Sequence, residues 1–282
     1  MDRRLIALAA ALFAAGCAGH RPPAAPSAAP AAAVPAPPAD PTSLRYAAGT
    51  ARYRVEQATH VVQEVMGQVN SADVSSHHVI STVASDSGPN LALAVRVDSI
   101  EVSGPEGADL SSVTAARGQT FHLVVAPSGL VVAVQSPDTT NLVLRQFGLG
   151  LREFFPHLPA APVTAGETWT DTVTTTNGGE VSVTMRSVRQ NRVVGWEDRD
   201  GARALHIAST STYSVSGSGE AQGQPVEMSG NGQSTRDAFI SAAGVFLGSV
   251  ESDSALINAN VTSVGITVPI RQTRRSTVTR LP

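Results

Sequence analysis

Few residues of this chain have the type and spacing that metal binding or catalysis needs. Glu153 and His157 are four residues apart, so one helix face could present both to a metal ion, but Pro156 lies between them. Asp198 and Asp200 start like a calcium-binding loop, yet Ala202 follows where a further oxygen ligand is needed. From these two incomplete matches we expect that the chain holds no metal ion.

The usual signatures of catalysis are also missing. The sequence has no G-x-S-x-G nucleophile elbow, no H-E-x-x-H zinc motif and no P-loop. All 20 basic residues are arginine, which removes Schiff-base and P-loop lysine chemistry. The net charge of −3 gives no reason to expect a nucleic-acid partner. We therefore expect no catalytic residue, no cofactor and no enzymatic activity.

The N-terminal residues do specify one modification. An apolar run at residues 5–15 follows two arginines; it is too short to cross a bilayer and has the layout of a secretory signal. It ends in A-A-G-C at residues 14–17, which resembles the lipobox of bacterial lipoproteins. The resemblance implies that residues 1–16 are removed as a lipoprotein signal peptide and that Cys17 is acylated, for example with palmitate.

Acylation would also account for the only cysteine of the chain. The alternative is an ordinary signal peptide with an incidental Cys17. Ala18 follows the cysteine and is not Asp, which by resemblance to enterobacterial sorting rules implies the outer membrane, with the protein facing the periplasm. We thus expect a membrane anchor through acylated Cys17 in the cell envelope.

The residues after the cysteine read as a spacer. Eight of the 26 residues from Ala18 to Ser43 are proline and ten are alanine. Such a composition has no large apolar side chains to bury and fixes many φ angles, so residues 17–43 are predicted to be an extended, semi-rigid linker. The folded part is expected to start at residue 44.

Alternation of apolar and polar residues at period two dominates the rest of the chain and predicts half-buried strands. The alternating apolar residues of 91–97 share one face of a strand. The pattern resumes at Ile100 after a shift that a β-bulge would produce. Asp200-Gly201 is a hairpin signal, and S-G-N-G at residues 229–232 reads as a turn. We expect about ten to twelve antiparallel strands in a mainly β fold, built as curved antiparallel sheets or a half-barrel.

A weak internal repeat divides this β region. TFHLVVAPSGLVVAVQSPD at residues 120–138 aligns without gaps on TRDAFISAAGVFLGSVESD at residues 235–253, so that Gly129 falls on Gly244. Each segment reads as a strand, a small-residue turn ending in Gly, and a return strand. We predict two related halves at residues 44–138 and 159–282, with chance similarity between two hairpins as the alternative.

A central amphipathic helix at residues 139–158 is predicted between the halves, capped at its start by one of residues 138–140 and kinked or ended by Pro156. Its apolar positions follow steps of four, four, three and four: Val143, Phe147, Leu151, Phe154 and Leu158. The stripe is either a core helix under a curved sheet, which we favour, or one wall of a hydrophobic-ligand site.

The segment after this stripe carries a family resemblance. It has the pattern L-P-x-x-P-V-x-x-G-x-x-W, formed by Leu158, Pro159, Pro162, Val163, Gly166 and Trp169. Together with the helix and the lipobox it resembles a family of uncharacterised bacterial envelope lipoproteins, which has no assigned activity. A looser similarity in fold is to LolA and LppX half-barrel lipoproteins, in which a curved sheet wraps a helix and holds acyl chains.

Two functions follow from these expectations. The first is a lipid-anchored cell-envelope protein whose non-catalytic β domain binds a hydrophobic or lipidic ligand or an envelope partner. The alternative is a purely structural or assembly lipoprotein with a closed core and no ligand. The two differ in the volume and lining of any cavity beside residues 141–158.

Overall fold

The computed structural model describes residues 44–105, 113, 115–139, 141–159, 162–178, 181–199, 201–221 and 223–282. The predicted signal peptide, Cys17 and the predicted spacer lie outside the described residues, so the expectations for residues 1–43 stay predictions. Within the described part of the chain, no helix combines the length and the apolar character that a bilayer span requires.

The described residues form eleven strands and one helix, α3 (Leu142–Leu151), so the chain is mainly β, as predicted. The strands are β1 (Gly49–Val65), β2 (Gln68–Ser87), β3 (Asn90–Ser103), β4 (Thr120–Val125), β5 (Val131–Gln135), β6 (Thr168–Asn177), β7 (Val181–Arg199), β8 (Ala202–Ala221), β9 (Gln224–Ser241), β10 (Phe246–Val261) and β11 (Ile266–Leu281).

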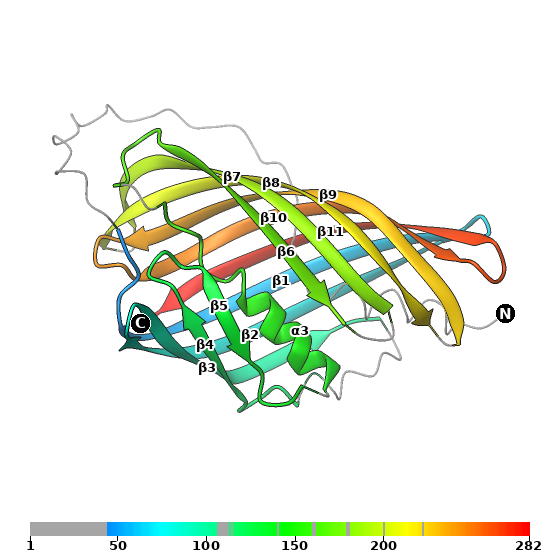
Figure 1. Cartoon of the computed structure of the whole chain (residues 1–282), viewed down its shortest axis with the longest axis horizontal. Coiled ribbons are helices and arrows are strands. Elements are labelled where there is room, and N and C mark those ends of the chain that lie inside the picture. Colours follow the sequence, from blue (N-terminus) through cyan, green and yellow to red (C-terminus); the bar gives the residue numbers. More distant parts are fainter. Residues whose placement is uncertain are drawn as a thin grey trace.

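All eleven strands belong to one antiparallel sheet, in the order β5-β4-β3-β2-β1-β11-β10-β9-β8-β7-β6. The sheet curves into a long trough, and its edge strands β5 and β6 do not pair with each other (Figure 1). Helix α3 contacts both edge strands. The predicted curved antiparallel sheet with one helix is therefore confirmed, and both halves of the chain share it.

The trough has two different ends, because antiparallel strands turn at alternate ends of the sheet. Leu44, the C-terminus and the hairpins β4–β5 and β9–β10 lie at one end, which we call the proximal end. The hairpins β1–β2 and β10–β11 project together from the opposite, distal end, at the right of Figure 1. Any anchor attached through residues 17–43 thus joins the fold at its proximal end.

The two hairpins of the internal repeat have the same hydrogen bonds. In the first, the Ala126 N–H donates to Leu130 O (2.8 Å) and the Gly129 N–H to Ala126 O (2.8 Å). In the second, the Ser241 N–H donates to Val245 O (2.8 Å) and the Gly244 N–H to Ser241 O (2.9 Å). The aligned residues thus close the same turn in both halves.

The start of the folded chain runs between these two hairpins. The Tyr46 N–H donates to Pro127 O (2.8 Å), and the Ala47 N–H donates to Gly244 O (3.2 Å). Gly244 has a φ of 75°, and a Cβ added there would collide with Arg45 O. Glycine is needed at this turn because both its backbone conformation and the passing chain exclude a side chain.

Glycines inside strands allow the sheet to curl tightly. A Cβ at Gly232 would lie 2.7 Å from Ser254 O on the neighbouring strand, and one at Gly217 would lie 2.6 Å from Ser182 O. The turn predicted from S-G-N-G at residues 229–232 is wrong, because these residues lie within β9. Their glycines serve close strand approach in a curved sheet and not a reversal of the chain.

The helix is shorter than the predicted range of residues 139–158. Asn141 is the N-cap, and its Oδ1 accepts hydrogen bonds from the backbone N–H groups of Val143 (3.0 Å) and Leu144 (3.2 Å). The helix ends at Leu151, well before Pro156, in a turn whose N–H groups bond three residues back. After this turn the chain is not helical, and Arg236 of β9 donates hydrogen bonds to the carbonyls of Glu153 and Phe154 there.

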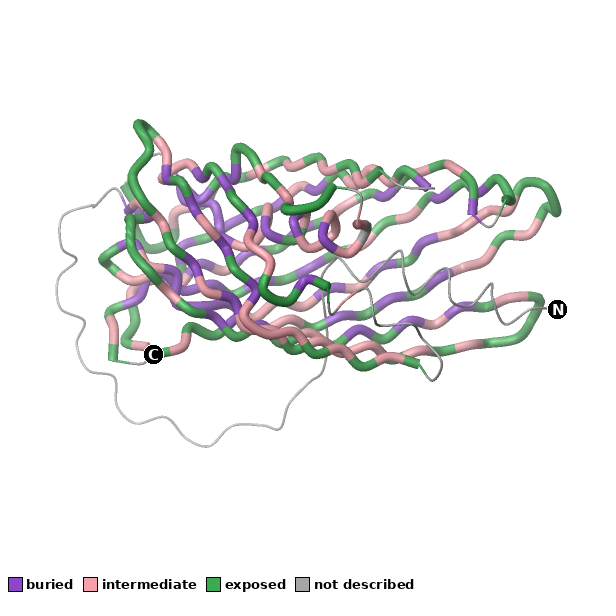
Figure 2. The backbone as a smooth tube through the Cα atoms, turned by 90° about the horizontal axis from the view of Figure 1, so that it is seen from below, coloured by how far each residue is buried: buried purple, intermediate pink, exposed green. Residues whose placement is uncertain are grey.

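Two apolar clusters line the inside of the trough, and buried positions alternate with exposed ones along its strands (Figure 2). The first cluster surrounds α3 at the proximal end and includes Ile80, Val95, Phe121, Leu205 and Phe246. The second lies towards the distal end, away from the helix, and includes Val61, Val181, Val226, Ile257 and Ile270. Polar side chains lie between these two apolar clusters.

Candidate functional site

A band of polar side chains crosses the inside of the trough between the two apolar clusters. Polar residues occupy inward positions at matching heights on neighbouring strands, in two rows that we call the polar band. The first row is Thr59, Arg274, Asp253, Ser234, Ser211, Arg189 and Asp171; the second is Gln57, Ser276, Glu251, Arg236, Ser209 and Asn191. Most of these side chains are buried.

Arg236 of the polar band binds the segment that follows the helix. Its Nη1 donates to the Glu153 carbonyl (2.8 Å) and its Nη2 donates to the Phe154 carbonyl (2.7 Å). Nη2 also donates to Ser249 Oγ (3.3 Å), and Nε lies 3.8 Å from a carboxylate oxygen of Glu251. One buried guanidinium thereby joins α3 and its exit turn, the plug (residues 141–159), to the floor of the trough.

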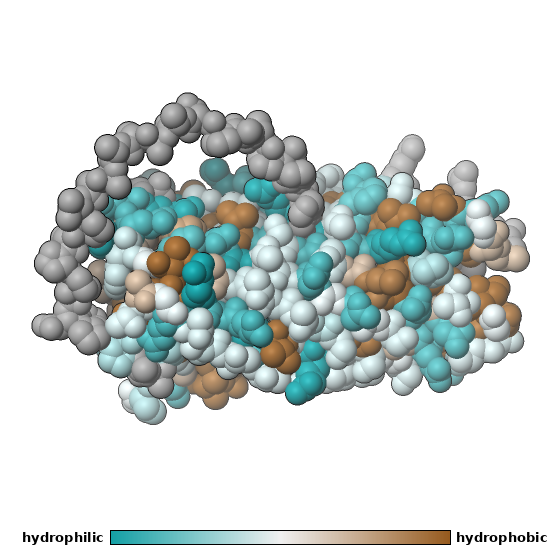
Figure 3. Space-filling view, turned by 90° about the horizontal axis from the view of Figure 1, so that it is seen from above, coloured by the Kyte–Doolittle hydropathy of each residue, from teal (hydrophilic) through white to brown (hydrophobic). Residues whose placement is uncertain are grey.

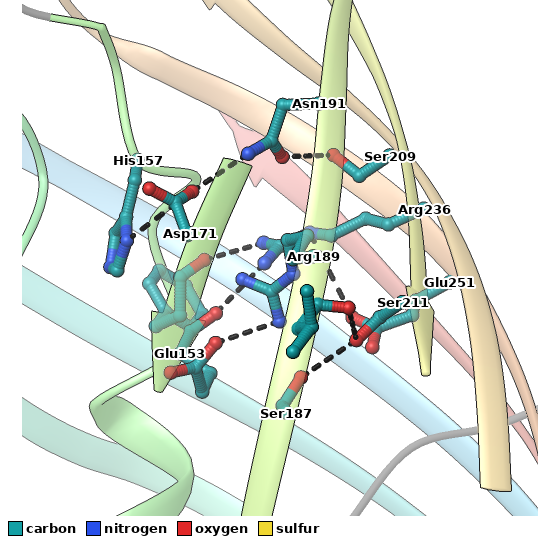
Figure 4. A network of polar contacts seen from close by, with 12 residues as sticks. Glu153, His157, Asp171, Ser187, Arg189, Asn191, Ser209, Ser211, Arg236 and Glu251 are labelled. Atoms are coloured by element: carbon teal, nitrogen blue, oxygen red, sulfur yellow. Dashed lines mark hydrogen bonds and ion pairs between the residues drawn. The ribbon is translucent and has the colours of Figure 1, made fainter. Parts of the chain in front are cut away.

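A second set of contacts fixes the same turn through its side chains (Figure 4). Arg189 Nη2 lies 2.7 Å from Glu153 Oε2, which forms a largely buried ion pair. Asp171 Oδ2 accepts a hydrogen bond from Asn191 Nδ2 (2.7 Å) and lies 3.7 Å from His157 Nδ1. The plug therefore rests on charged groups from β6, β7 and β9.

The histidine of this network is held in its neutral form. Burial lowers the pKa of His157; the carboxylates of Glu153 and Asp171 raise it again, while Arg189 and Arg236 lower it. Its Nε2 is buried and has no hydrogen-bond partner among the described residues. A neutral, enclosed imidazole fits a packing role better than proton transfer to a substrate.

The same network includes Glu153 and His157, the pair considered above for a metal ion. The two do not share a helix face, because both lie after the end of α3 at Leu151. Glu153 is paired with Arg189 instead, and no group of three metal-ligating side chains occurs among the residues that the structure describes. Glu153 and His157 thus help to attach the plug to the sheet.

Aromatic rings fill the space between the plug and the sheet. Phe147 stacks on Phe121 with ring centroids 5.1 Å apart, and Phe154 packs edge-on against Tyr53 at 5.4 Å and Phe246 at 5.5 Å. A cavity at the proximal end, lined by Tyr46, Tyr53, Phe155 and Phe246 among others, has a volume of about 60 Å³. An engineered cavity of about 150 Å³ holds one benzene, so this space is too small for an acyl chain.

The five residues of the predicted stripe do not all lie on the helix. Val143, Phe147 and Leu151 are helical, whereas Phe154 and Leu158 follow its end. Leu151 and Leu158 are buried, and the other three are half-buried; of these, Phe147 and Phe154 pack against the first cluster. The pattern did not single out Leu144 and Phe155, which are buried as well, because they fall beside the stripe.

The L-P-x-x-P-V-x-x-G-x-x-W segment returns the chain from the plug to β6. Leu158, Pro159 and Val163 are buried, and Pro162 is exposed. Gly166 has a φ of 86° and donates its N–H to Val193 O (2.8 Å), which starts the pairing of β6 with β7. Trp169 points into the trough and packs against the first cluster. The motif residues thus have structural roles at this return.

The second apolar cluster meets the polar band at Asp253. The Tyr213 hydroxyl donates to Asp253 Oδ1 (2.9 Å), and Arg274 is the cross-strand neighbour on β11. Asp253 is 4% exposed, and burial raises its pKa to about 7, although the hydrogen bond and the arginine act to lower it. Asp253 Oδ2 and Arg274 Nε are buried and have no hydrogen-bond partner among the described residues.

The raised pKa of Asp253 predicts a pH dependence of stability. The folded state binds the proton more tightly than the unfolded chain, so stability falls as the pH rises from about 4 to about 7 and is constant above that. Asp253→Asn should remove this fall and be up to about 4 kcal/mol more stable than the wild type at pH 8. Urea denaturation of both proteins between pH 4 and pH 8 measures the effect.

Glu227→Gln is the matched control, because this carboxyl is exposed on the outer face. We expect it to keep the wild-type profile. If Asp253→Asn keeps that profile as well, Asp253 is charged in the folded state and Arg274 compensates for its burial.

The outer face of the described strands carries a polar groove. A shallow groove over β7 to β10 has a volume of about 810 Å³ and is lined mainly by polar side chains, among them Ser182, Thr184, Ser218 and Asn258. Figure 3 shows one side of this surface, on which apolar residues form separate small groups. A groove of this composition does not suit an acyl chain.

No family model matches the chain, and neither does any curated protein. Among solved structures, it is similar to Neisserial surface protein A, with a TM-score of 0.21 at 7% identity over 83% of this chain and 99% of that one. It is also similar to OccK2 of Pseudomonas aeruginosa, with a TM-score of 0.25 at 8% identity over 83% and 98% of the two chains. For a DUF1329 family protein of Desulfovibrio piger the TM-score is 0.16 at 9% identity, over 78% and 83%. Likenesses this distant assign no family, and the resemblance to envelope lipoproteins stays a prediction.

Proposed function

We propose that this chain is a lipid-anchored protein of the bacterial cell envelope whose β domain binds a protein partner and performs no catalysis. The anchor is acylated Cys17, and the linker at residues 17–43 holds the domain away from the outer membrane in the periplasm. We favour a protein partner over an enclosed ligand because the plug is packed closely against the sheet. Aromatic rings fill the space between α3 and the sheet, and the cavity at the proximal end, lined by Phe155 and Phe246, is about 60 Å³.

The position of the chain start supports this arrangement. Leu44 enters at the proximal end, so the anchor would lie on that side and the distal hairpins would point away from the membrane. Met66, Val69 and Val264 are exposed on or beside those hairpin tips. Strand β1 alone has 17 residues, which corresponds to about 55 Å of rigid sheet between anchor and tip.

One observation favours a second candidate, an amphiphilic ligand in the distal half of the trough. The second apolar cluster contains no residue of α3, and the buried groups of Asp253 and Arg274 adjoin it. An apolar chain along that cluster would place a polar head group at the band. This candidate keeps the hydrophobic or lipidic ligand expected from the sequence, but it places the binding site at the second apolar cluster and not beside the helix.

Membrane fractionation tests the anchor. The wild-type chain should sediment with membranes and carry added acyl mass at Cys17 by mass spectrometry, whereas Cys17→Ala should carry none. Ser27→Ala, within the same linker, should behave as the wild type does. Acyl chains still present on the Cys17→Ala variant would mean that the lipobox interpretation is wrong.

Native mass spectrometry decides between partner and ligand. A chain lacking residues 1–16 and carrying Cys17→Ala is incubated with phosphatidylethanolamine and phosphatidylglycerol vesicles and then re-isolated. We expect the mass of the polypeptide alone. Stoichiometric lipid that is lost on Asp253→Ala would instead establish the amphiphile site and remove the basis for a closed core.

A further inference from the structure

We propose that the edge strand β6 is a self-association surface, and that two copies of this chain pair β6 with β6 in antiparallel register. This inference names the partner in the proposed function as a second copy of the chain, and it rests on that function only for the membrane setting. Its starting point is that, among the described strands, β6 has β7 on one side and no neighbour on the other.

The composition of β6 leaves its edge open to pairing. Natural proteins usually protect edge strands with proline, lysine, a bulge or short length. β6 has ten residues, T-W-T-D-T-V-T-T-T-N, with no proline and no basic residue, and it pairs with β7 without a register shift. The other edge strand, β5, has only five residues, and α3 contacts both edges. Of the two edges, β6 is the longer.

The free backbone groups of β6 belong to its threonines. The Val193 N–H donates to Glu167 O (2.9 Å), so residue 167 and every second residue after it face β7 in hydrogen-bonded pairs. The even-numbered residues therefore direct their N–H and C=O groups away from the sheet. They are Thr168, Thr170, Thr172, Thr174 and Thr176, and all five side chains are exposed on the outer face.

A two-fold axis at Val173 makes this edge complementary to itself. Thr172 then faces Thr174 of the second copy and Thr170 faces Thr176, each pair exchanging two backbone hydrogen bonds, and threonine pairs are favourable cross-strand neighbours. On the inner face Val173 meets Val173, and Asp171 meets the hydroxyl-bearing Thr175 and not another carboxylate. No like charges oppose each other, and the contact is isologous and closed.

The half-burial of the inward β6 residues fits a missing neighbour. Trp169, Asp171, Val173, Thr175 and Asn177 are all half-buried. On β7 the side chains opposite the first three of these, Asn191, Arg189 and Ser187, are buried, whereas Met185 and Val183 opposite the last two are half-buried. A pairing along one strand buries little area and gives a weak dimer in solution. Confinement to a membrane by an anchor raises the effective concentration of the copies.

Cysteine crosslinking tests both the contact and its register. Val173→Cys places two thiols in a non-hydrogen-bonded pair with Cα atoms about 4.5 Å apart, within the range of a disulfide. Thr175→Cys is the matched control on the same face and strand, because its two copies would be about 14 Å apart. In a Cys17→Ala background each variant has a single thiol, so pairing is read without any contribution from the anchor.

We expect Val173→Cys to form a disulfide-linked dimer at least tenfold faster than Thr175→Cys under mild oxidation. Adding Thr172→Pro should abolish the difference, because it removes an edge N–H that the monomer does not use, whereas Thr172→Val should preserve it. Equal rates at the two positions, faster crosslinking at 175, or no dimer at either would overturn the proposal. Since this test needs no anchor, its failure leaves the membrane-fractionation result unaffected.

The full-length chain in its own envelope provides the second measurement. Acylation would use the thiol of Cys17, so Val173→Cys should run as a dimer on a non-reducing gel of the membrane fraction. A wild-type chain of monomer mass at all concentrations in sedimentation, together with no crosslink in the envelope, would also refute self-association.

Discussion

Replacing Arg236 by leucine is expected to destabilise the fold by about 3 to 5 kcal/mol, because one buried guanidinium holds the plug to the sheet. Arg236 is 5% exposed and donates to the carbonyls of Glu153 and Phe154. Leucine leaves both carbonyls without that donor and removes the guanidinium that lies 3.8 Å from the Glu251 carboxylate. A loss of this size is a large part of the stability of a typical domain.

Lysine at this position separates charge from geometry. Arg236→Lys keeps the positive charge but has no planar fork to reach two successive carbonyls, so we expect an intermediate loss of about 1 to 3 kcal/mol. Arg192→Leu, which removes an exposed arginine from the outer face of β7, should change stability by no more than about 0.5 kcal/mol. Urea denaturation curves of the three variants give the comparison.

Limited proteolysis locates the effect of Arg236→Leu. If the plug loosens before the sheet unfolds, chymotrypsin should cut at Phe154 or Phe155 under native conditions, where the wild type is protected. A variant that loses less than about 1 kcal/mol and stays uncut would mean that the aromatic contacts alone fix the plug.

The sheet could be predicted from the sequence because its signals are local and repeated. Alternation at period two fixed which residues share a face, and the shift after Val97 does mark a bulge: β2 and β3 change register between Val79 and Ile80. Strands β7 and β8, which end at Arg199 and start at Ala202, pair as the hairpin that was predicted there. The repeat with Gly129 on Gly244 was detectable because both glycines close the same turn.

The polar band could not be recognised by the same rule. Alternation assigns polar residues to solvent, so R-S-V-R-Q-N at residues 186–191 reads as an exposed stretch, although Ser187, Arg189 and Asn191 point inwards. Strand parity was the available signal, since Arg189 has the same parity as Val193 and Arg236 the same parity as Ala238. Parity alone does not show that such a polar residue is buried, because its hydrogen-bond partners come from distant strands, which no local pattern encodes.

The plug was only partly predictable for a related reason. Its helix has a strong apolar stripe, but Asn141 and not residues 138–140 provides the cap, and α3 ends seven residues before the predicted limit at residue 158. Arg236, 82 residues further along the chain, binds the carbonyl of Phe154 and so stabilises a non-helical turn there. Tertiary contacts of this kind override helix periodicity.

Phe246→Ala is expected to cost about 3 to 5 kcal/mol, since it removes the ring on which the plug packs. Phe246 is 1% exposed, and its ring contacts Tyr53 (centroids 5.7 Å apart), Phe154 (5.5 Å) and Phe155 (5.7 Å). Leu256→Ala on the same strand is the control, because that side chain is exposed and should matter by about 0.5 kcal/mol or less. Urea denaturation of both variants measures the difference.

The same substitution tests whether the core is closed. Phe246 lines the cavity of about 60 Å³, so its removal should enlarge that space to a size that accepts a small apolar molecule. Benzene should then raise the melting temperature of Phe246→Ala and leave that of the wild type unchanged, by binding only the folded variant. If benzene stabilises the wild type equally, the plug already leaves room for an apolar ligand, and the amphiphile becomes the better candidate than a protein partner.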